Sequence, residues 1–323
     1  MSALQQMVAA FGIPNSYITT PTATPAAFGD AFEGGFYTGM IWNELVQSAT
    51  SHLIEAGSKS FAVANMSATP LAYSGQTLEV RSRANPTNKM IGVVTGAAGT
   101  TLTINVTSVG GSGTITDWSI MSKYRIITSP KASGENSGRA YKNVNTAAPS
   151  ACQTLTEGYK AMLAMVASDT ATVYPMAWWC YGLSIGGKTD WYPPARDELE
   201  LQWRNLKPTT VNNSTGSRSK SGIAYGNLGS VDDGAFDNIG VNNNSSPVGS
   251  GYTLTVPSQV AAGKNFRTGE SEAVEGSRDY WSASEYSATQ AWSLLGLSTG
   301  AGAMDPYGKS GSSYVRAVRR SII

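Results

Sequence analysis

The side chains best suited to covalent or metal chemistry are scarce in this chain. Among 323 residues there is one histidine, His52, and there are two cysteines, Cys152 and Cys180. Metal centres, Ser-His-Asp triads and proton relays depend on histidine, so a single one removes most of this chemistry. Two thiols cannot form a disulfide scaffold in a chain of this length. We expect buried free thiols, although pairing of the two stays open.

Acidic residues gather in two places. The stretch from Asp197 to Glu200 lies at the expected start of a helix, where carboxylates favour the positive end of the helix dipole. Carboxylates alone do not make a glycosidase, so we expect a scaffold role for them. The second group comprises Asp232, Asp233 and Asp237. Its spacing does not match an EF-hand loop. We therefore expect no catalytic residue, no metal and no cofactor, with calcium as the one alternative left open.

The overall charge balance argues against two classes of partner. Lys and Arg number 23 and Asp and Glu 22, for a net charge of +1, and charged residues make up only 14% of the chain. Such a chain has no long-range field to hold a nucleic-acid backbone or an anionic membrane. No run approaches the roughly 20 apolar residues of a membrane span, and the first residues lack a signal-peptide pattern. We expect a soluble protein that is not exported by a cleaved signal, does not insert into a membrane and binds no nucleic acid.

Abundant Gly, Ser, Thr and Asn predict an α+β fold that is mostly β. Residues 1–33 are rich in Thr, Ala and Pro and predict an extended arm that orders only against a partner. Residues 34–45 predict a first strand. Residues 46–117 form short runs between Ser-Gly, Asn-Pro and Gly-Gly, which predicts a small antiparallel β domain. Within this domain the alternating apolar residues of a half-buried strand are Leu102, Ile104 and Val106.

Two helices are expected in residues 118–323. The first lies within 154–168, with Thr154 or Thr156 as its cap. Its apolar stripe comprises Tyr159, Met162, Leu163 and Val166. The second follows a proline pair at 193–194 and ends before Pro208. Its buried face comprises Leu199, Trp203 and Leu206. From Pro208 to about residue 277 the sequence predicts long surface loops, and the residues after them predict closing strands.

Five segments, taken in order, carry a family resemblance: GGFYTG, YRIITSPKASGE, GGKTDWYPPARDELELQWRNLKP, DYWSASEYSATQAW and YVRAVRR. They resemble the Lcl-type C-terminal domain, a C-type-lectin-like fold related to phage major tropism determinants and to the formylglycine-generating enzyme fold. The resemblance covers residues 34–45 and 118–323. Residues 46–117 resemble a second module of virion fibre proteins, and we expect this module to be inserted into a hairpin turn, a site where insertions are tolerated.

The resemblance implies a structural role for a set of residues: Gly187, Asp190, Trp191, Arg196, Trp281, Trp292 and Arg316. Gly186 and Gly187 allow a tight turn above Trp191, and Asp190 or Arg196 is expected to tie a loop to the helix start. The arginines at 316, 319 and 320 are expected to be buried against carboxylates such as Glu285. The chain lacks the Glu-Pro-Asn, Gln-Pro-Asp and Trp-Asn-Asp motifs of sugar-binding lectins and the cysteines of the oxidase relatives, so the resemblance implies neither activity.

Residues 286–314 correspond to the exposed face that meets the receptor in related tropism determinants. Tyrosine among small polar residues suits such a surface because it offers stiff contact area at low entropic cost. The expected receptor-binding residues are Tyr286, Ser287, Gln290, Met304, Asp305, Tyr307 and Lys309. Trp292, in the same segment, matches a core tryptophan of the family and is expected to be buried.

These features predict a bacteriophage virion surface protein, a tail fibre, spike or head fibre, and not an enzyme. We expect a homotrimer that assembles in the host cytoplasm and is joined to other virion proteins through residues 1–33. Its expected partner is a protein or glycan receptor on the bacterial surface. The alternative is a structural or decorating virion protein without a specific receptor, and sequence separates the two poorly. An enzyme ranks third, because no base or activated nucleophile is evident.

Overall fold

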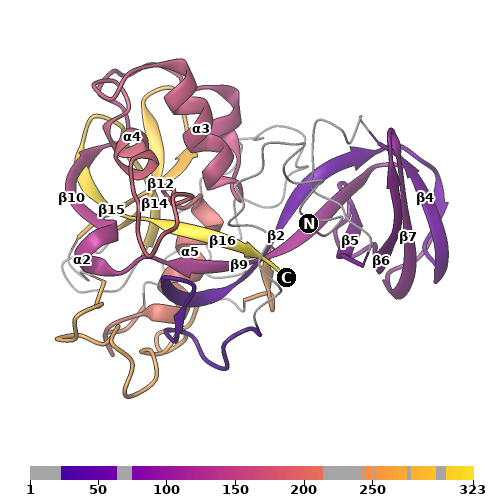
Figure 1. Cartoon of the computed structure of the whole chain (residues 1–323), viewed down its shortest axis with the longest axis horizontal. Helices are drawn as coiled ribbons and strands as arrows, with labels where there is room; N and C mark the ends of the chain where they lie inside the picture. The colour runs from indigo at the N-terminus through magenta and orange to yellow at the C-terminus, as the bar shows by residue number, and fades with distance from the viewer. Residues whose placement is uncertain are drawn as a thin grey trace.

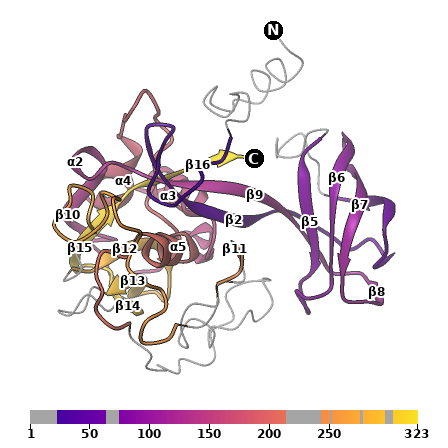
Figure 2. The same cartoon turned by 90° about the horizontal axis from the view of Figure 1, so that it is seen from below.

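The computed structural model describes residues 23–63, 75–213, 242, 244–249, 252–274, 278–295 and 303–323. The fold is α+β and mostly β, as the composition predicts. Figures 1 and 2 show a large lobe, which carries the helices, and a small all-β lobe, joined by two long strands. These strands are β2 (Gly35–Ser48) and β9 (Trp118–Thr128). We call the described residues between 44 and 121 the small lobe and the others the large lobe.

The small lobe is a curled antiparallel sheet. Its strands β4 (Gly57–Ala62), β5 (Thr77–Ser82), β6 (Lys89–Ala98) and β7 (Thr101–Gly110) follow the order β9-β5-β6-β7-β4. The predicted alternation in β7 is confirmed, because Leu102, Ile104 and Val106 are buried. They pack in a core of their own with Phe61 and Trp118.

Side chains that follow β2 cover the outer edge of β4. Ser48 Oγ donates a hydrogen bond of 2.6 Å to Ala62 O, and Ala62 N donates one of 2.8 Å to Thr50 Oγ1. His52 Nε2 lies 2.8 Å from Ser60 O. An uncovered edge strand invites pairing with other chains, so these contacts protect the lobe. His52, the single histidine of the chain, thus contributes to covering this strand edge.

β2 and β9 run through both lobes, and their ladder extends from the pair Phe36–Thr128 to the pair Ser48–Trp118. The second edge of β9 changes partner along its length: residues 118–122 pair with β5, whereas residues 124–128 pair with β16 (Val318–Ile322). The strand expected at 34–45 therefore continues to Ser48. Asn43 and Ser122, paired in the ladder and fully buried, stand between the apolar cores of the two lobes.

The large lobe contains a second sheet with the order β10-β15-β12-β13-β14. These strands are β10 (Glu135–Ala140), β12 (Tyr280–Glu285), β13 (Gln290–Leu295), β14 (Ala303–Gly308) and β15 (Ser312–Arg316). The longer helices are α3 (Gly158–Ser168), α4 (Pro175–Tyr181) and α5 (Arg196–Leu206). The short elements are β1 (Ala31–Phe32), β3 (His52–Leu53), β8 (Thr114–Ile115), α2 (Lys131–Gly134), η3 (Ser150–Gln153) and β11 (Ser245–Ser246).

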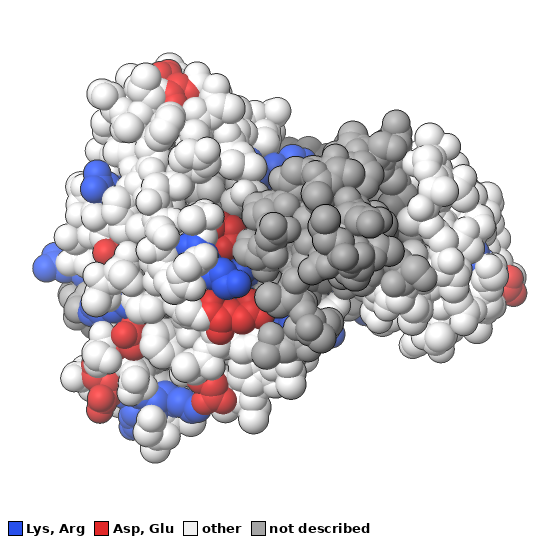
Figure 3. Space-filling model, viewed as in Figure 1, with Lys and Arg blue, Asp and Glu red and all other residues white. Residues whose placement is uncertain are grey.

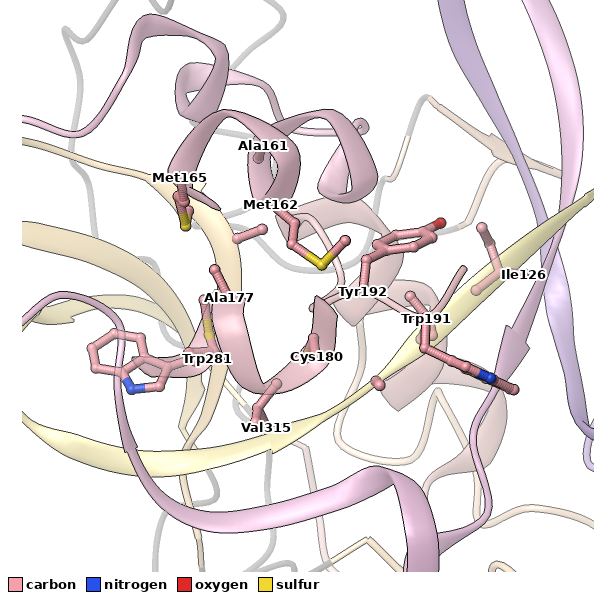
Figure 4. Packing of buried hydrophobic residues seen from close by; sticks show 14 of the residues in the cluster. Ile126, Ala161, Met162, Met165, Ala177, Cys180, Trp191, Tyr192, Trp281 and Val315 are labelled. Carbon is pink, nitrogen blue, oxygen red and sulfur yellow. The ribbon is translucent and has the colours of Figure 1, made fainter. Parts of the chain in front are cut away.

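The main core of the large lobe lies between these helices and strands. Figure 4 shows Met162 of α3 and Cys180 of α4 among Tyr192, Trp281 and Val315. Both cysteines are free and buried, as expected. Burial raises the pKa of the Cys152 thiol to about 12, so this thiol is not a nucleophile at neutral pH.

The two expected helices are present, with two corrections. In α5 the predicted apolar face of Leu199, Trp203 and Leu206 is buried. In α3, however, the buried residues include Met162 and Met165, whereas Leu163 is 39% exposed. Tyr159, Met162 and Val166 belong to or pack against the core as predicted, so only Leu163 was wrongly assigned to the stripe. The predicted cap is wrong, because the N-cap residue of α3 is Glu157 and no side chain caps the helix. Thr154 Oγ1 instead accepts a hydrogen bond from Glu157 N at 3.1 Å, ahead of the helix.

Part of the expected N-terminal arm belongs to the large lobe instead. β1 pairs with β2, and Glu33 accepts a 2.7 Å hydrogen bond from Arg319 Nη1. Arg125 Nε donates to Thr24 Oγ1 at 2.8 Å, and Asp30 pairs with Lys264. Residues 23–33 are thus fixed by contacts within the chain. Residues 1–22 lie outside the described part.

Two further expectations concern membranes and metals. No helix in the described part of the chain is long and apolar enough to cross a membrane. Over the same residues, no group of three or more His, Cys, Asp or Glu side chains is placed to hold a metal ion. The acidic residues for which calcium was left open, Asp232, Asp233 and Asp237, lie outside the described residues.

Candidate binding face

The glycine-rich turn before α5 is a scaffold element. Gly186 and Gly187 have φ values of 60° and 71°, a backbone region that favours glycine. Trp191 is buried beside this turn, and its Nε1 donates to Ile185 O at 3.4 Å. Asp190 does not hold the helix start. It accepts two hydrogen bonds, of 2.9 and 3.0 Å, from the buried Arg319 of β16.

The C-terminal arginines are buried against carboxylates, as expected, but their partners differ. Arg316 donates to Glu272 at 2.6 Å and to Glu135 at 3.2 Å, not to Glu285. Arg320 donates to Glu157 at 2.7 Å. Glu285 instead forms a buried ion pair with Lys309.

Lys309 was expected on the surface, and that prediction is wrong. Its side chain is fully buried beside Glu285, to which its Nζ donates a short hydrogen bond. The same Nζ donates to Thr146 O at 3.1 Å and to Ala288 O at 2.8 Å. Burial lowers the pKa of Lys309, and Glu285 opposes this shift. One buried ammonium group thus joins three segments that lie far apart in the sequence.

The partners of Lys309 are themselves held in place. Ala148 N donates to Glu285 Oε1 at 2.7 Å. Lys142, also buried, donates to Thr146 Oγ1 and to Ala147 O, each at 2.7 Å. Hydrogen bonds from Lys142 and Lys309 therefore fix the loop at 143–147. Lys309 lies more than a hundred positions away in the sequence, so the conformation of the loop depends on the tertiary structure.

The turn between β12 and β13 is fixed from within. Tyr286 N donates to Gln290 O at 3.0 Å, and Ser287 Oγ accepts from Gln290 N at 3.1 Å. Below the turn, Lys309 N donates to Thr289 O at 3.1 Å.

Together these segments make a surface that we call the candidate face: residues 143–147, 286–290 and 307–310. Val144 is 45% exposed and Tyr307 is 44% exposed, whereas the side chains of Tyr286, Ser287 and Gln290 are half-buried. Lys309 is the only ionisable Lys, Arg, Asp or Glu within these ranges, and it is buried. The exposed or half-buried side chains of the face are therefore neutral, and they include Val144, two tyrosines, and residues with hydroxyl or amide groups.

Two other predicted binding residues lie away from the face. Asp305, in β14, is buried, and Met304 is half-buried beside the cluster of Leu294, Trp203 and Tyr280. The expectation that Trp292 belongs to the core is confirmed, because it is 1% exposed.

Tryptophans support the tyrosines of the face from below. The ring of Tyr286 meets Trp292 edge to face at 5.1 Å, and the guanidinium group of Arg196 lies 5.1 Å from the centre of the Trp292 ring. Tyr307 lies 5.7 Å from Trp281, whose Nε1 donates to Arg139 O at 2.8 Å. Trp281 and Trp292 thus hold the two aromatic groups of the face in defined positions.

Sequence reasoning missed residues 143–147. The run NVNTA has the composition of any surface loop, and only the contacts of Lys142 and Lys309 place it beside the 286–290 turn. Comparisons with family models, with curated proteins and with solved structures gave no match for this chain.

Proposed function

We propose that this protein is a bacteriophage virion surface protein, a fibre or spike subunit, that attaches to the host cell through the candidate face. In this proposal residues 34–45 and 118–323 form a C-type-lectin-like domain, and residues 46–117 are inserted between paired strands of it. The protein is not an enzyme. It forms a homotrimer, joins other virion proteins through its N-terminal residues, and binds a protein or glycan on the bacterial surface.

The observation that carries the proposal is that the candidate face consists of neutral polar and aromatic side chains held in place by buried residues beneath them. An outward surface of tyrosine, serine, threonine, asparagine and glutamine suits recognition, because aromatic rings supply contact area and small polar groups supply adaptable hydrogen bonds. The buried Lys309–Glu285 pair lies beneath this surface. In Figure 3 charged side chains are scattered over the large lobe, with no broad field of one sign among the coloured residues.

The insertion is supported by strand register. Ser48 and Trp118 are direct partners at the end of the β2–β9 ladder, so the chain leaves and returns at one place. Loop ends and hairpin turns of this kind tolerate inserted domains.

The test is saturable binding of the labelled full-length protein to cells of the strain on which the particle grows. Tyr307→Ala removes the most exposed aromatic ring of the face and should weaken binding by at least about tenfold, as truncation of an aromatic anchor does. Tyr181→Ala is the matched control, because Tyr181 is 49% exposed on α4 and outside the face. Binding should change little on raising salt, since the face carries no exposed charge.

Equal binding of wild type and Tyr307→Ala would refute the assignment of the face. Absence of saturable binding by the wild type would favour the alternative, a decorating virion protein without a specific receptor. Shortening of surface polysaccharide during incubation would instead indicate an enzyme.

A further inference from the structure

A chain of polar contacts begins in the small lobe at Arg81 of β5. This side chain is buried, and its Nη2 donates to Asn244 Oδ1 at 2.5 Å. Glu79 lies at 3.7 Å from Arg81 Nη1 and also binds Lys89 at 2.9 Å. A buried guanidinium group is costly unless its donors are satisfied, so the contact with Asn244 is important for its placement.

Asn244 bridges the two lobes. Its Nδ2 donates to Asp197 Oδ2 of α5 at 2.7 Å, while its Oδ1 accepts from Arg81. Its backbone oxygen accepts from Trp42 N of β2 at 2.6 Å. An uncharged amide that accepts from a cation and donates to an anion satisfies both buried ions without direct contact between them.

A second amide fixes the same region of α5. Asn242 Nδ2 donates to Asp197 O at 2.9 Å and to Glu200 Oε2 at 2.8 Å, and Asn242 Oδ1 accepts from Asn244 N at 3.1 Å. Asn244 is therefore held by its own backbone as well as by its side chain, and its position cannot change without disturbing α5.

From Asp197 the contacts continue to the candidate face. Asp197 Oδ1 accepts from Arg196 Nε at 3.0 Å, and Arg196 lies over Trp292, which supports Tyr286 edge to face. Arg196 N also donates to Ser284 Oγ at 2.9 Å, one residue before Glu285. Each step from Arg81 to Tyr286 is thus a direct contact between buried or half-buried side chains.

We propose that this relay, Arg81 to Asn244 to Asp197 to Arg196, couples the small lobe to the candidate face and holds Tyr286 and the 286–290 turn in place. Its members are positioning residues, and none is part of the exposed surface. A path of contacts does not by itself establish coupling, so the test is a measured response at the far end of the relay. That the coupled surface is the attachment site rests on the proposed function, but the coupling itself is a property of the chain alone.

The experiment is amide hydrogen exchange on the full-length protein, compared between wild type, Arg81→Met, Asn244→Leu and the control Arg83→Met. Arg83 follows β5 in the same lobe and donates to Gln47 Oε1 at 2.9 Å, whereas the guanidinium group that donates to Asn244 is that of Arg81. Both relay variants should speed exchange of the amides in residues 284–292 by about tenfold, as expected for loss of a hydrogen bond to a charged group. The control should leave these amides unchanged.

Unchanged exchange at 284–292 in both relay variants would overturn the proposal, and so would a uniform increase over the whole chain, which indicates general destabilisation. Failure of the two proposals can be told apart. If Tyr307→Ala leaves cell binding unchanged while Arg81→Met speeds exchange at 284–292, the relay stands and the attachment face does not.

Discussion

Replacement of Lys309 by methionine tests whether the candidate face depends on the ion pair beneath it. The side chains of Lys309 and Glu285 are 0% and 3% exposed, so neither charge is shared with water. In Lys309→Met the Glu285 carboxylate keeps one donor, Ala148 N, and loses its counter-ion. Thr146 O and Ala288 O each lose the ammonium donor as well.

The magnitude follows from these losses. Removal of one partner of a buried ion pair typically costs about 3–5 kcal/mol, because the remaining charge stays buried without compensation. For a domain of this size, each kcal/mol lowers the Tm by roughly 2–4 °C, so we expect a decrease on the order of 10 °C. Lys309→Met with Glu285→Gln removes both charges and keeps an acceptor for Ala148 N. The double variant should therefore regain a large part of the lost stability.

Chemical denaturation and calorimetry of the four proteins in the cycle give the coupling energy between the two side chains. Lys160→Met, at an exposed position of α3, controls for loss of a positive charge. The reasoning fails if Lys309→Met lowers the free energy of unfolding by less than about 1 kcal/mol, the scale of an exposed pair. It also fails if the double variant is no more stable than Lys309→Met.

Three further predictions concern Glu198, Asn43 and the boundary between the two lobes. Burial raises the pKa of Glu198 to about 7, opposed by Arg320 and by hydrogen bonds from Ala195 N and Tyr192. The folded state then binds this proton more tightly than the unfolded state does, so the stabilisation is complete below the ordinary pKa and is lost as pH rises through about 7. Between pH 5 and 8, chemical denaturation should show that the free energy of unfolding decreases by up to about 3 kcal/mol, and Glu198→Gln should abolish this decrease. Neither amide atom of the buried Asn43 has a hydrogen-bond partner, so Asn43→Leu should raise the free energy of unfolding by about 1–3 kcal/mol in urea titrations, and a decrease would contradict this account. Replacement of residues 44–121 by an Asn-Gly turn should leave a folded large lobe with one cooperative thermal transition. The reason is that Asn43 and Ser122 are ladder partners and the main core of the large lobe contains no residue from the deleted part. Loss of the near-ultraviolet circular dichroism signal would show instead that the two lobes fold together.

Local patterns were sufficient where a residue's environment is set by its own element. The alternation of Leu102, Ile104 and Val106 predicted the buried side of β7, and the proline pair and Leu199 predicted α5 and its apolar face. In α3 the same reasoning failed for Leu163. Leu163 and Met165 flank Met162 on opposite sides of the helix surface, so the sequence pattern allows either of them to extend the buried face, and in the structure Met165 does so.

The candidate site depended on contacts that no local pattern carries. Lys309 lies in the run YGKSGSS, which is typical of an exposed loop, and only the meeting of Glu285, Thr146 and Ala288 gives it a buried role. Arg316 was correctly expected to pair with a carboxylate, but the choice of Glu272 and Glu135 over Glu285 is settled by the fold. The identity of a partner across 44 or 181 positions is not encoded in spacing along one strand.

The separation between buried ions and exposed neutral groups has a consequence for how this surface can vary. Lys309 and Lys142 donate to backbone oxygens of the face, and Glu285 accepts from the backbone nitrogen of Ala148. Backbone groups do not change when a side chain is replaced. The exposed side chains of Val144 and Tyr307 carry little of this stabilisation, since surface substitutions away from such contacts usually alter stability by less than about 0.5 kcal/mol. The contacts that stabilise the face and its exposed side chains thus belong to different residues. If the face binds a receptor, its exposed residues can be exchanged to change the receptor while Lys309, Glu285 and Lys142 stay in place.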